Sequence, residues 1–157
     1  MNPPIRILVV DDDPDILNGT VRLLEKAGYT VDRAASGEQA LLEVQKQPPN
    51  LLLLDHDMPG MDGIEVCRRI KQDTALADVL VVIVSGSYTE SDEQAEGLES
   101  GVDGYIVRPI ANRELLAQVR LFVRILRLTS SLRINAEELK KNNEAVRQTH
   151  LASINLL

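Results

Sequence analysis

The chain has 157 residues, 44% of them hydrophobic but only 3% aromatic, which suffices for one domain with an aliphatic core and an appendage. Residues 1–126 carry 12 basic and 21 acidic side chains, and their net charge of −9 argues against direct nucleic-acid binding and suits a cation ligand. The single cysteine excludes an internal disulfide. Without a secretion signal or an apolar run of about 18 residues, the sequence predicts a cytoplasmic protein with no membrane span.

Apolar strands and amphipathic helices alternate along residues 1–126. Gly28 and Gly101 follow two of the helices as stop signals, and Asp13 before Pro14 has the position of an N-cap. Five strand–helix units with short connections predict an α/β fold, a parallel sheet with helices on both faces. Strands are expected at 5–10, 30–34, 51–54, 79–84 and 104–107, and helices at 14–27, 37–46, 64–71, 90–100 and from about 114 onward, the last capped by Asn112.

The last helix is expected to run far beyond the domain, because no glycine or proline interrupts residues 110–157. Apolar residues recur at intervals of seven, but the interleaved positions turn polar, which is typical of a weak coiled-coil seam. The sequence therefore predicts a helical extension at 127–157 that serves as a connector or pairs two chains in parallel; a solvated helix or a frayed tail is the alternative. The two sets are Ile125, Leu132, Leu139 and Val146, and Leu128, Asn135, Asn142 and Thr149.

Acidic residues follow two of the expected strands. Asp55 ends a run of four leucines, and Asp11 and Asp12 follow the strand at 5–10. Because parallel strands end at one edge of a sheet, these carboxylates are expected to meet in one crevice. Three carboxylates repel each other unless a cation bridges them, and hard oxygen ligands favour Mg²⁺. Since an aspartate can attack phosphorus, the pattern indicates phosphoryl transfer onto Asp55.

Two later strand ends supply groups that such a reaction needs. Arg108 follows the fifth strand and provides a cation for phosphoryl oxygens, and Ser85 at the end of the fourth provides a hydroxyl. Each residue alone would more often be a helix cap or a solvated side chain. Their shared position at the ends of strands favours a common site.

These runs resemble the receiver domain of two-component response regulators, of the CheY-like superfamily, over residues 5 to about 126. The matching runs are Ile7-Leu8-Val9-Val10-Asp11-Asp12-Asp13-Pro14, Leu53-Leu54-Asp55-His56-Asp57-Met58-Pro59-Gly60-Met61-Asp62-Gly63, Val84-Ser85-Gly86 and Gly104-Tyr105-Ile106-Val107-Arg108-Pro109. The resemblance implies a flavodoxin-like sheet of order 2-1-3-4-5 at 1–126, and it allows this chain to be the N-terminal part of a longer signalling protein. It also implies a protein that is no enzyme beyond self-catalysed phosphorylation and dephosphorylation.

The resemblance further implies that a histidine kinase or a phosphotransfer protein phosphorylates Asp55. Mg²⁺, or Mn²⁺, would be held by Asp12, Asp55 and the backbone carbonyl of Asp57, with Asp11 in support. Ser85 and Tyr105 would act as the switch that changes the surface of helix 4, strand 5 and helix 5 and so controls an output.

One residue departs from the family pattern, because Arg108 stands where the family has lysine. Arginine is longer and planar, so the hypothesis is slower phosphorylation or weaker coupling to the switch. The alternative function that follows is a pseudo-receiver, a scaffold that binds proteins without phosphorylation.

Two further alternatives concern the acidic run itself. The Asp57 side chain either strengthens cation binding or is simply solvated. The Asp55-His56-Asp57 sequence also resembles the nucleophile motif of haloacid-dehalogenase-type phosphatases. That enzyme class is disfavoured, because its motif usually lies on the first strand and its other acids follow the motif instead of preceding it.

Overall fold

The structure is a computed structural model that describes residues 3–86 and 100–155. The chain divides into two compact units, one ending at residue 123 and one beginning at residue 124. The elements are β1 (Arg6–Val10), α1 (Pro14–Lys26), β2 (Thr30–Ala34), α2 (Gly37–Lys46), β3 (Leu51–Asp55), α3 (Gly63–Gln72), the 3₁₀ turn η1 (Thr74–Leu76), β4 (Leu80–Ser85), β5 (Gly104–Val107) and α5 (Asn112–Asn155).

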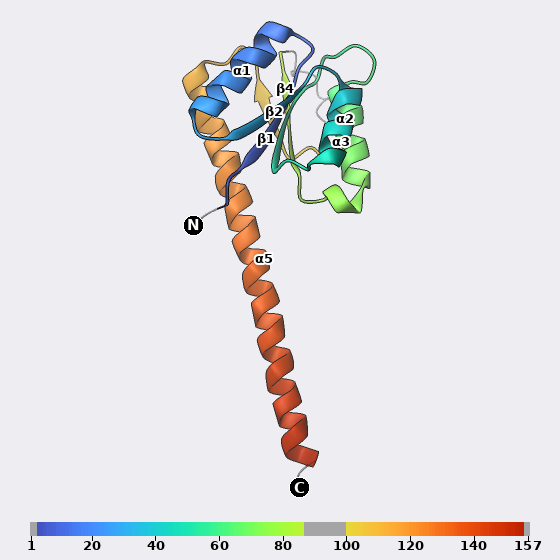
Figure 1. The fold of residues 1–157 in the computed structure, drawn as a ribbon, viewed down its shortest axis with the longest axis vertical. Coiled ribbons are helices and arrows are strands. Elements are labelled where there is room, and N and C mark those ends of the chain that lie inside the picture. Colours follow the sequence, from blue (N-terminus) through green and yellow to red (C-terminus); the bar gives the residue numbers. More distant parts are fainter. Residues whose placement is uncertain (1–2, 87–99, 156–157) are drawn as a thin grey trace. The chain divides into compact units, whose positions relative to one another are not determined.

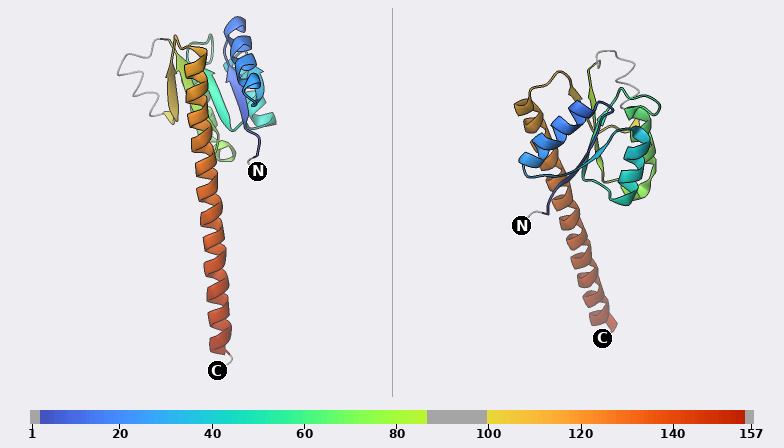
Figure 2. Two further views of the ribbon diagram at one scale, coloured as in Figure 1. Left: turned by 90° about the vertical axis from the view of Figure 1, so that its left-hand side faces the viewer. Right: turned by 45° about the horizontal axis from the view of Figure 1, so that its top comes forward.

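The first unit is built on one parallel five-stranded sheet of order β2-β1-β3-β4-β5, as the sequence predicts. β3 lies in the centre and all five of its residues are buried, because helices cover both faces of the sheet. Figure 1 shows α2 and α3 on one side of the sheet and α1 on the other. The two views of Figure 2 place the first turns of α5 on the side of α1.

The expected bounds of the strands and helices are confirmed to within about two residues, the disagreement normal for such bounds. Asp13 caps α1 as predicted, since its side chain accepts from the backbone N–H groups of Asp15 and Ile16. Asn112 belongs to α5 instead of preceding it, because the N–H of Leu115 already donates to the carbonyl of Ala111 at 2.9 Å. The helix expected at 90–100 lies almost entirely outside the described residues.

The last helix changes character along its length. Within the first unit it buries Leu115, Val119 and Val123, whereas every side chain described from residue 127 to 154 is exposed. Among the described residues, no helix has both the length and the apolar character needed to cross a membrane.

Candidate functional site

Three aspartates meet where β1 and β3 end. Asp11 and Asp12 follow β1, and Asp55 is the last residue of β3, next to β1 in the sheet. Each offers one carboxylate oxygen, and these three oxygens lie within 4.8 Å of one another. Asp11 and Asp55 are buried and Asp12 is exposed, so the cluster has an open side. The geometry that was expected from the strand ends is therefore present.

Asp55 is buried, and its surroundings disfavour its negative charge. Burial, followed by the charge of Asp11, raises its pKa from 3.8 to about 6, although the backbone N–H of Asp57 and the nearby Arg108 act in the opposite direction. The Asp57 N–H donates to Asp55 Oδ1 at 3.2 Å. A carboxylate of raised pKa is more basic than an ordinary one, and a cation beside it would favour its ionised form.

Arg108 reaches this cluster from the end of β5. Its Nη2 donates to Asp11 Oδ2 at 2.9 Å, and its Nη1 lies 4.0 Å from Asp55 Oδ1. The backbone N–H of Arg108 donates to the carbonyl of Ser85 at 2.9 Å, which ties its loop to the end of β4. The sequence placed Arg108 near the acids but could not show that Asp11 is its closer partner.

Ser85 and Tyr105 lie on the two strands beyond β3. Asp55 is paired with Val84, so Ser85 stands one residue further toward the same edge, and it is buried. Tyr105 pairs with Ile83 and is partly buried against the hydrophobic core. Ser85 is thus placed beside the acidic cluster, whereas Tyr105 lies further back along its strand.

The Asp57 side chain does not join the three aspartates. Its Oδ1 lies 3.1 Å from Nδ1 of His56, and the side chain is 62% exposed. Of the two interpretations of this residue, the structure favours the one in which the carboxylate is solvated and contributes to the site through its backbone.

Gly63 is a positioning residue that the sequence interpretation missed. A Cβ at this position would lie 2.5 Å from the carbonyl oxygen of Asp55, so only glycine allows α3 to begin so close to the end of β3. The N–H of Gly63 also donates to the carbonyl of His56 at 3.1 Å. The sequence signal for this role was the presence of Gly60 and Gly63 after Asp55. The sequence alone does not show which of the two lies against the end of β3.

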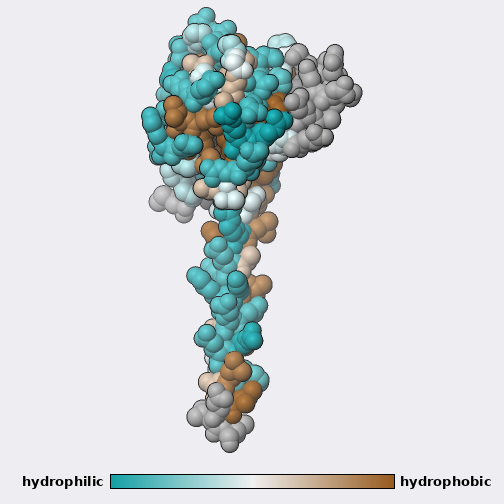
Figure 3. Space-filling model, turned by 90° about the vertical axis from the view of Figure 1, so that its right-hand side faces the viewer, coloured by the Kyte–Doolittle hydropathy of each residue, from teal (hydrophilic) through white to brown (hydrophobic). Residues whose placement is uncertain are grey.

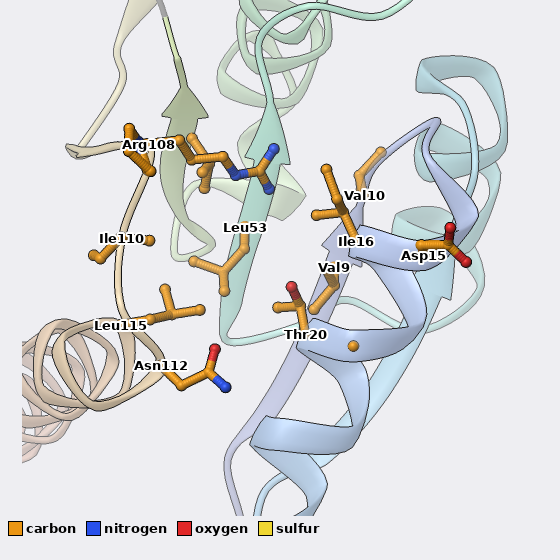
Figure 4. Close-up of a pocket in the computed structure, with 13 residues that line it drawn as sticks. Val9, Val10, Asp15, Ile16, Thr20, Leu53, Arg108, Ile110, Asn112 and Leu115 are labelled. Carbon is orange, nitrogen blue, oxygen red and sulfur yellow. The ribbon is translucent and has the colours of Figure 1, made fainter.

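A cavity of about 330 Å³ lies next to the site, between α1 and the segment that joins β5 to α5. Figure 4 shows Ile110 and Leu115 on one side of it and Val9 and Thr20 on the other. Arg108 extends above Leu53 in this view, so the cavity borders the side chain that contacts Asp11.

Comparison with known proteins agrees with this geometry. A family model described as the response regulator receiver domain matches residues 7–120. Response regulator MprA of Mycolicibacterium vanbaalenii is 38% identical over 121 residues, which cover 77% of this chain and 51% of the relative. PhoP of Bacillus subtilis, the alkaline phosphatase synthesis transcriptional regulatory protein, is 34% identical over 155 residues, 97% of this chain and 60% of the relative.

Solved structures show the same relationship. Chemotaxis protein CheY4 of Vibrio cholerae matches with a TM-score of 0.72 at 27% identity, over 76% of this chain and 99% of that one. The chain spans about half the length of curated relatives such as MprA. The sheet order and both kinds of match lead to one conclusion: this chain belongs to the response regulator receiver domain family of two-component systems.

Proposed function

We propose that Asp55 is the phosphoryl acceptor of this receiver and that a histidine kinase or a phosphotransfer protein is the donor. An oxygen of Asp55 forms a bond to phosphorus while the phosphorus–nitrogen bond of the donor histidine breaks, and its electron pair returns to the imidazole. The single observation that carries the proposal is the convergence of three carboxylates on the end of β3. We expect no enzymatic activity beyond self-catalysed phosphorylation and dephosphorylation.

The donor set suits a divalent cation. Three carboxylate oxygens within 4.8 Å are hard ligands of the kind that Mg²⁺ and Mn²⁺ prefer. Asp12 and Asp55 would hold the ion together with the backbone carbonyl of Asp57, and Asp11 would support it. A bound ion would offset negative charge on the phosphoryl oxygens as the donor approaches. Ser85, buried beside Asp55, is the residue we expect to contact the transferred group.

A phosphorylation assay tests this function. The full chain is incubated with Mg²⁺ and excess acetyl phosphate, and intact mass is followed. We expect a gain of about 80 daltons in the wild-type chain, one phosphate group, and none in Asp55→Asn. Asp57→Asn is the matched control, because that exposed carboxylate lies outside the cluster and its loss should leave the mass gain intact.

The same assay decides between a receiver and a pseudo-receiver. A chain that folds, binds Mg²⁺ and gains no mass from any phosphodonor would be a scaffold. Arg108 would then be the first residue to test as the cause of the missing phosphorylation. Restoring lysine with Arg108→Lys would then show whether the arginine is the cause.

We further propose that phosphorylation controls a downstream output through a surface that includes β5, the start of α5 and the helix expected at 90–100, which lies almost entirely outside the described residues. PhoP of Bacillus subtilis is by name a transcriptional regulatory protein, and 60% of its length matches. The output would lie in a longer form of this protein or in a partner. Adding beryllofluoride with Mg²⁺ should shift the amide NMR signals of β5 and early α5 in the wild-type chain and leave them unchanged in Asp55→Asn.

The exposed part of α5 supports pairing of two chains. Apolar residues that are 42–70% exposed recur every seven residues along this helix, at Ile125, Leu132, Leu139 and Val146. Figure 3 shows apolar side chains spaced among polar ones along this part of the chain. Such a stripe is self-complementary in a parallel two-stranded coiled coil. Light scattering should give twice the chain mass, and Leu132→Glu with Leu139→Glu should give a monomer.

A further inference from the structure

Arg108 already occupies one of the aspartates expected to support the divalent ion. Both oxygens of Asp11 are engaged, because Oδ1 accepts from the N–H of Asp13 at 2.9 Å and Oδ2 accepts from Arg108 Nη2 at 2.9 Å. The Asp11 side chain is only 2% exposed and that of Arg108 is 26% exposed, so water screens this ion pair weakly. Any cation that approaches Asp11 Oδ2 therefore meets a guanidinium group already bound there.

The chemistry of the arginine side chain favours this ion pair between Arg108 and Asp11. A guanidinium is planar and more weakly hydrated than an ammonium group, which suits a partly buried ion pair with a carboxylate. Its fork presents several N–H donors in fixed directions, and here one arm contacts Asp11 while the other lies 4.0 Å from Asp55. A lysine would instead bring a compact charge with three donors on one nitrogen and no planar fork.

A divalent ion and this guanidinium would repel each other strongly at such short range. Two positive groups within a few ångströms of the same carboxylates, partly shielded from water, cannot both keep their best positions. The cavity of about 330 Å³ that Arg108 borders offers its side chain room to shift without displacing the sheet.

We propose that Arg108 is a built-in competitor of the divalent ion for Asp11. In the metal-free receiver the guanidinium offsets part of the negative charge of the acidic cluster. When the ion binds, Arg108 is released from Asp11, and its fork, already close to Asp55, becomes available to the phosphoryl oxygens. Metal binding thus precedes and enables the contact between Arg108 and the phosphoryl group. This inference rests on the proposed metal site, and its test separates the two.

The test is a Mg²⁺ titration of the full chain, followed by amide NMR at about pH 7.5, well above the ordinary pKa range of carboxylates. Five proteins are compared: wild type, Arg108→Gln, Arg108→Lys, Asp55→Asn and Arg113→Gln. Arg113 is exposed at the start of α5, so its variant makes the same charge change and keeps the Arg108 contact with Asp11. The Nε–H signal of Arg108 provides a second measurement on the wild-type protein.

We expect Arg108→Gln to bind Mg²⁺ roughly tenfold more tightly than wild type or better, since it removes a nearby positive charge. Arg108→Lys should fall between the two, because it keeps the charge but loses the fork. Arg113→Gln should match wild type, and Asp55→Asn should bind much more weakly. The Arg108 Nε–H signal should shift with the same midpoint as the amide of Asp12.

Opposite results would overturn the inference. If Mg²⁺ binds in a manner that depends on Asp55 but equally well to wild type and to Arg108→Gln, the competition is wrong and the metal site stands. If Mg²⁺ binds to none of the proteins, the metal site fails and the competition fails with it. Thermal unfolding with saturating Mg²⁺ verifies that Arg108→Gln is folded, and Arg108→Lys supplies an independent variant should it not be.

Discussion

At the scale of single residues, burial and then the nearby charge of Asp11 oppose the negative charge of Asp55, and a bound cation would offset this cost. Asp55 is buried beside Asp11, and Arg108 offsets only part of the resulting charge, because its closer contact is with Asp11. A receiver in this state is less stable than the same fold without the charge on Asp55. A cation that bound to the cluster would offset this unfavourable charge and so stabilise the folded chain.

The pH dependence of stability should reveal the cost of charging Asp55 in its buried position beside Asp11. The pKa of Asp55 rises from 3.8 to about 6 on folding, so between these values the folded chain holds more protons than the unfolded chain. The free energy of unfolding should thus fall as pH rises from about 4 to about 6 and remain low above that. Without divalent ions, Asp55→Asn should avoid this loss and gain about 1–3 kcal/mol at neutral pH.

Urea unfolding at a series of pH values measures the effect, with Asp57→Asn as the control for an exposed carboxylate. The difference between Asp55→Asn and wild type should shrink below pH 4 and also when Mg²⁺ is added. A constant difference across the whole pH range would mean that charge on Asp55 is not its source.

Backbone contacts at Gly63 fix the position of Asp55. The methyl group of Gly63→Ala would press on the carbonyl of Asp55, which belongs to a strand that cannot easily move, so we expect a loss of about 1–3 kcal/mol in the free energy of unfolding. Gly19→Ala is a matched control, because no atom lies within 4 Å of its added Cβ, and alanine in helix α1 should stabilise by about 1 kcal/mol. Equal effects of the two substitutions would contradict this role.

At the scale of elements, polar residues between the apolar ones of the exposed stripe of α5 should limit the strength of chain pairing. Asn135 and Asn142 occupy the positions between its apolar residues, where a polar amide fixes register at a cost in stability. Replacing both with leucine should strengthen self-association by at least about tenfold and weaken the preference for two strands. Sedimentation at several concentrations checks this. Glu137→Gln with Glu144→Gln, outside the stripe, is the control, and no change in the Asn variant would argue against a coiled coil.

The elements that the sequence predicts best are those with strong local signals. The run of leucines in β3 predicts a strand of a parallel sheet that is buried on both faces. The Asp13-Pro14 pair predicts the start of α1, because aspartate caps the first turn and proline fits the first helical position. The η1 turn at Thr74–Leu76 was missed because three residues carry no periodicity.

Contacts between side chains from distant elements could not be predicted either. Sequence position placed Arg108 and Asp11 at one edge of the sheet, but their 2.9 Å contact depends on the path of the loop after β5. The turn of the Asp57 carboxylate toward His56 likewise follows from local rotamers rather than from any pattern.

At the scale of the whole molecule, α5 belongs to both compact units, with its buried residues ending at Val123. Removing residues 127–157 therefore takes away no buried side chain of the described chain.

At low protein concentration, the shortened chain should match the free energy of unfolding of the full chain to within about 0.5 kcal/mol. At high concentration only the full chain should gain stability, because pairing stabilises the folded state by mass action. Denaturation over a hundredfold range of concentration measures both effects, and a shortened chain that is less stable at every concentration would show that the extension supports the receiver directly.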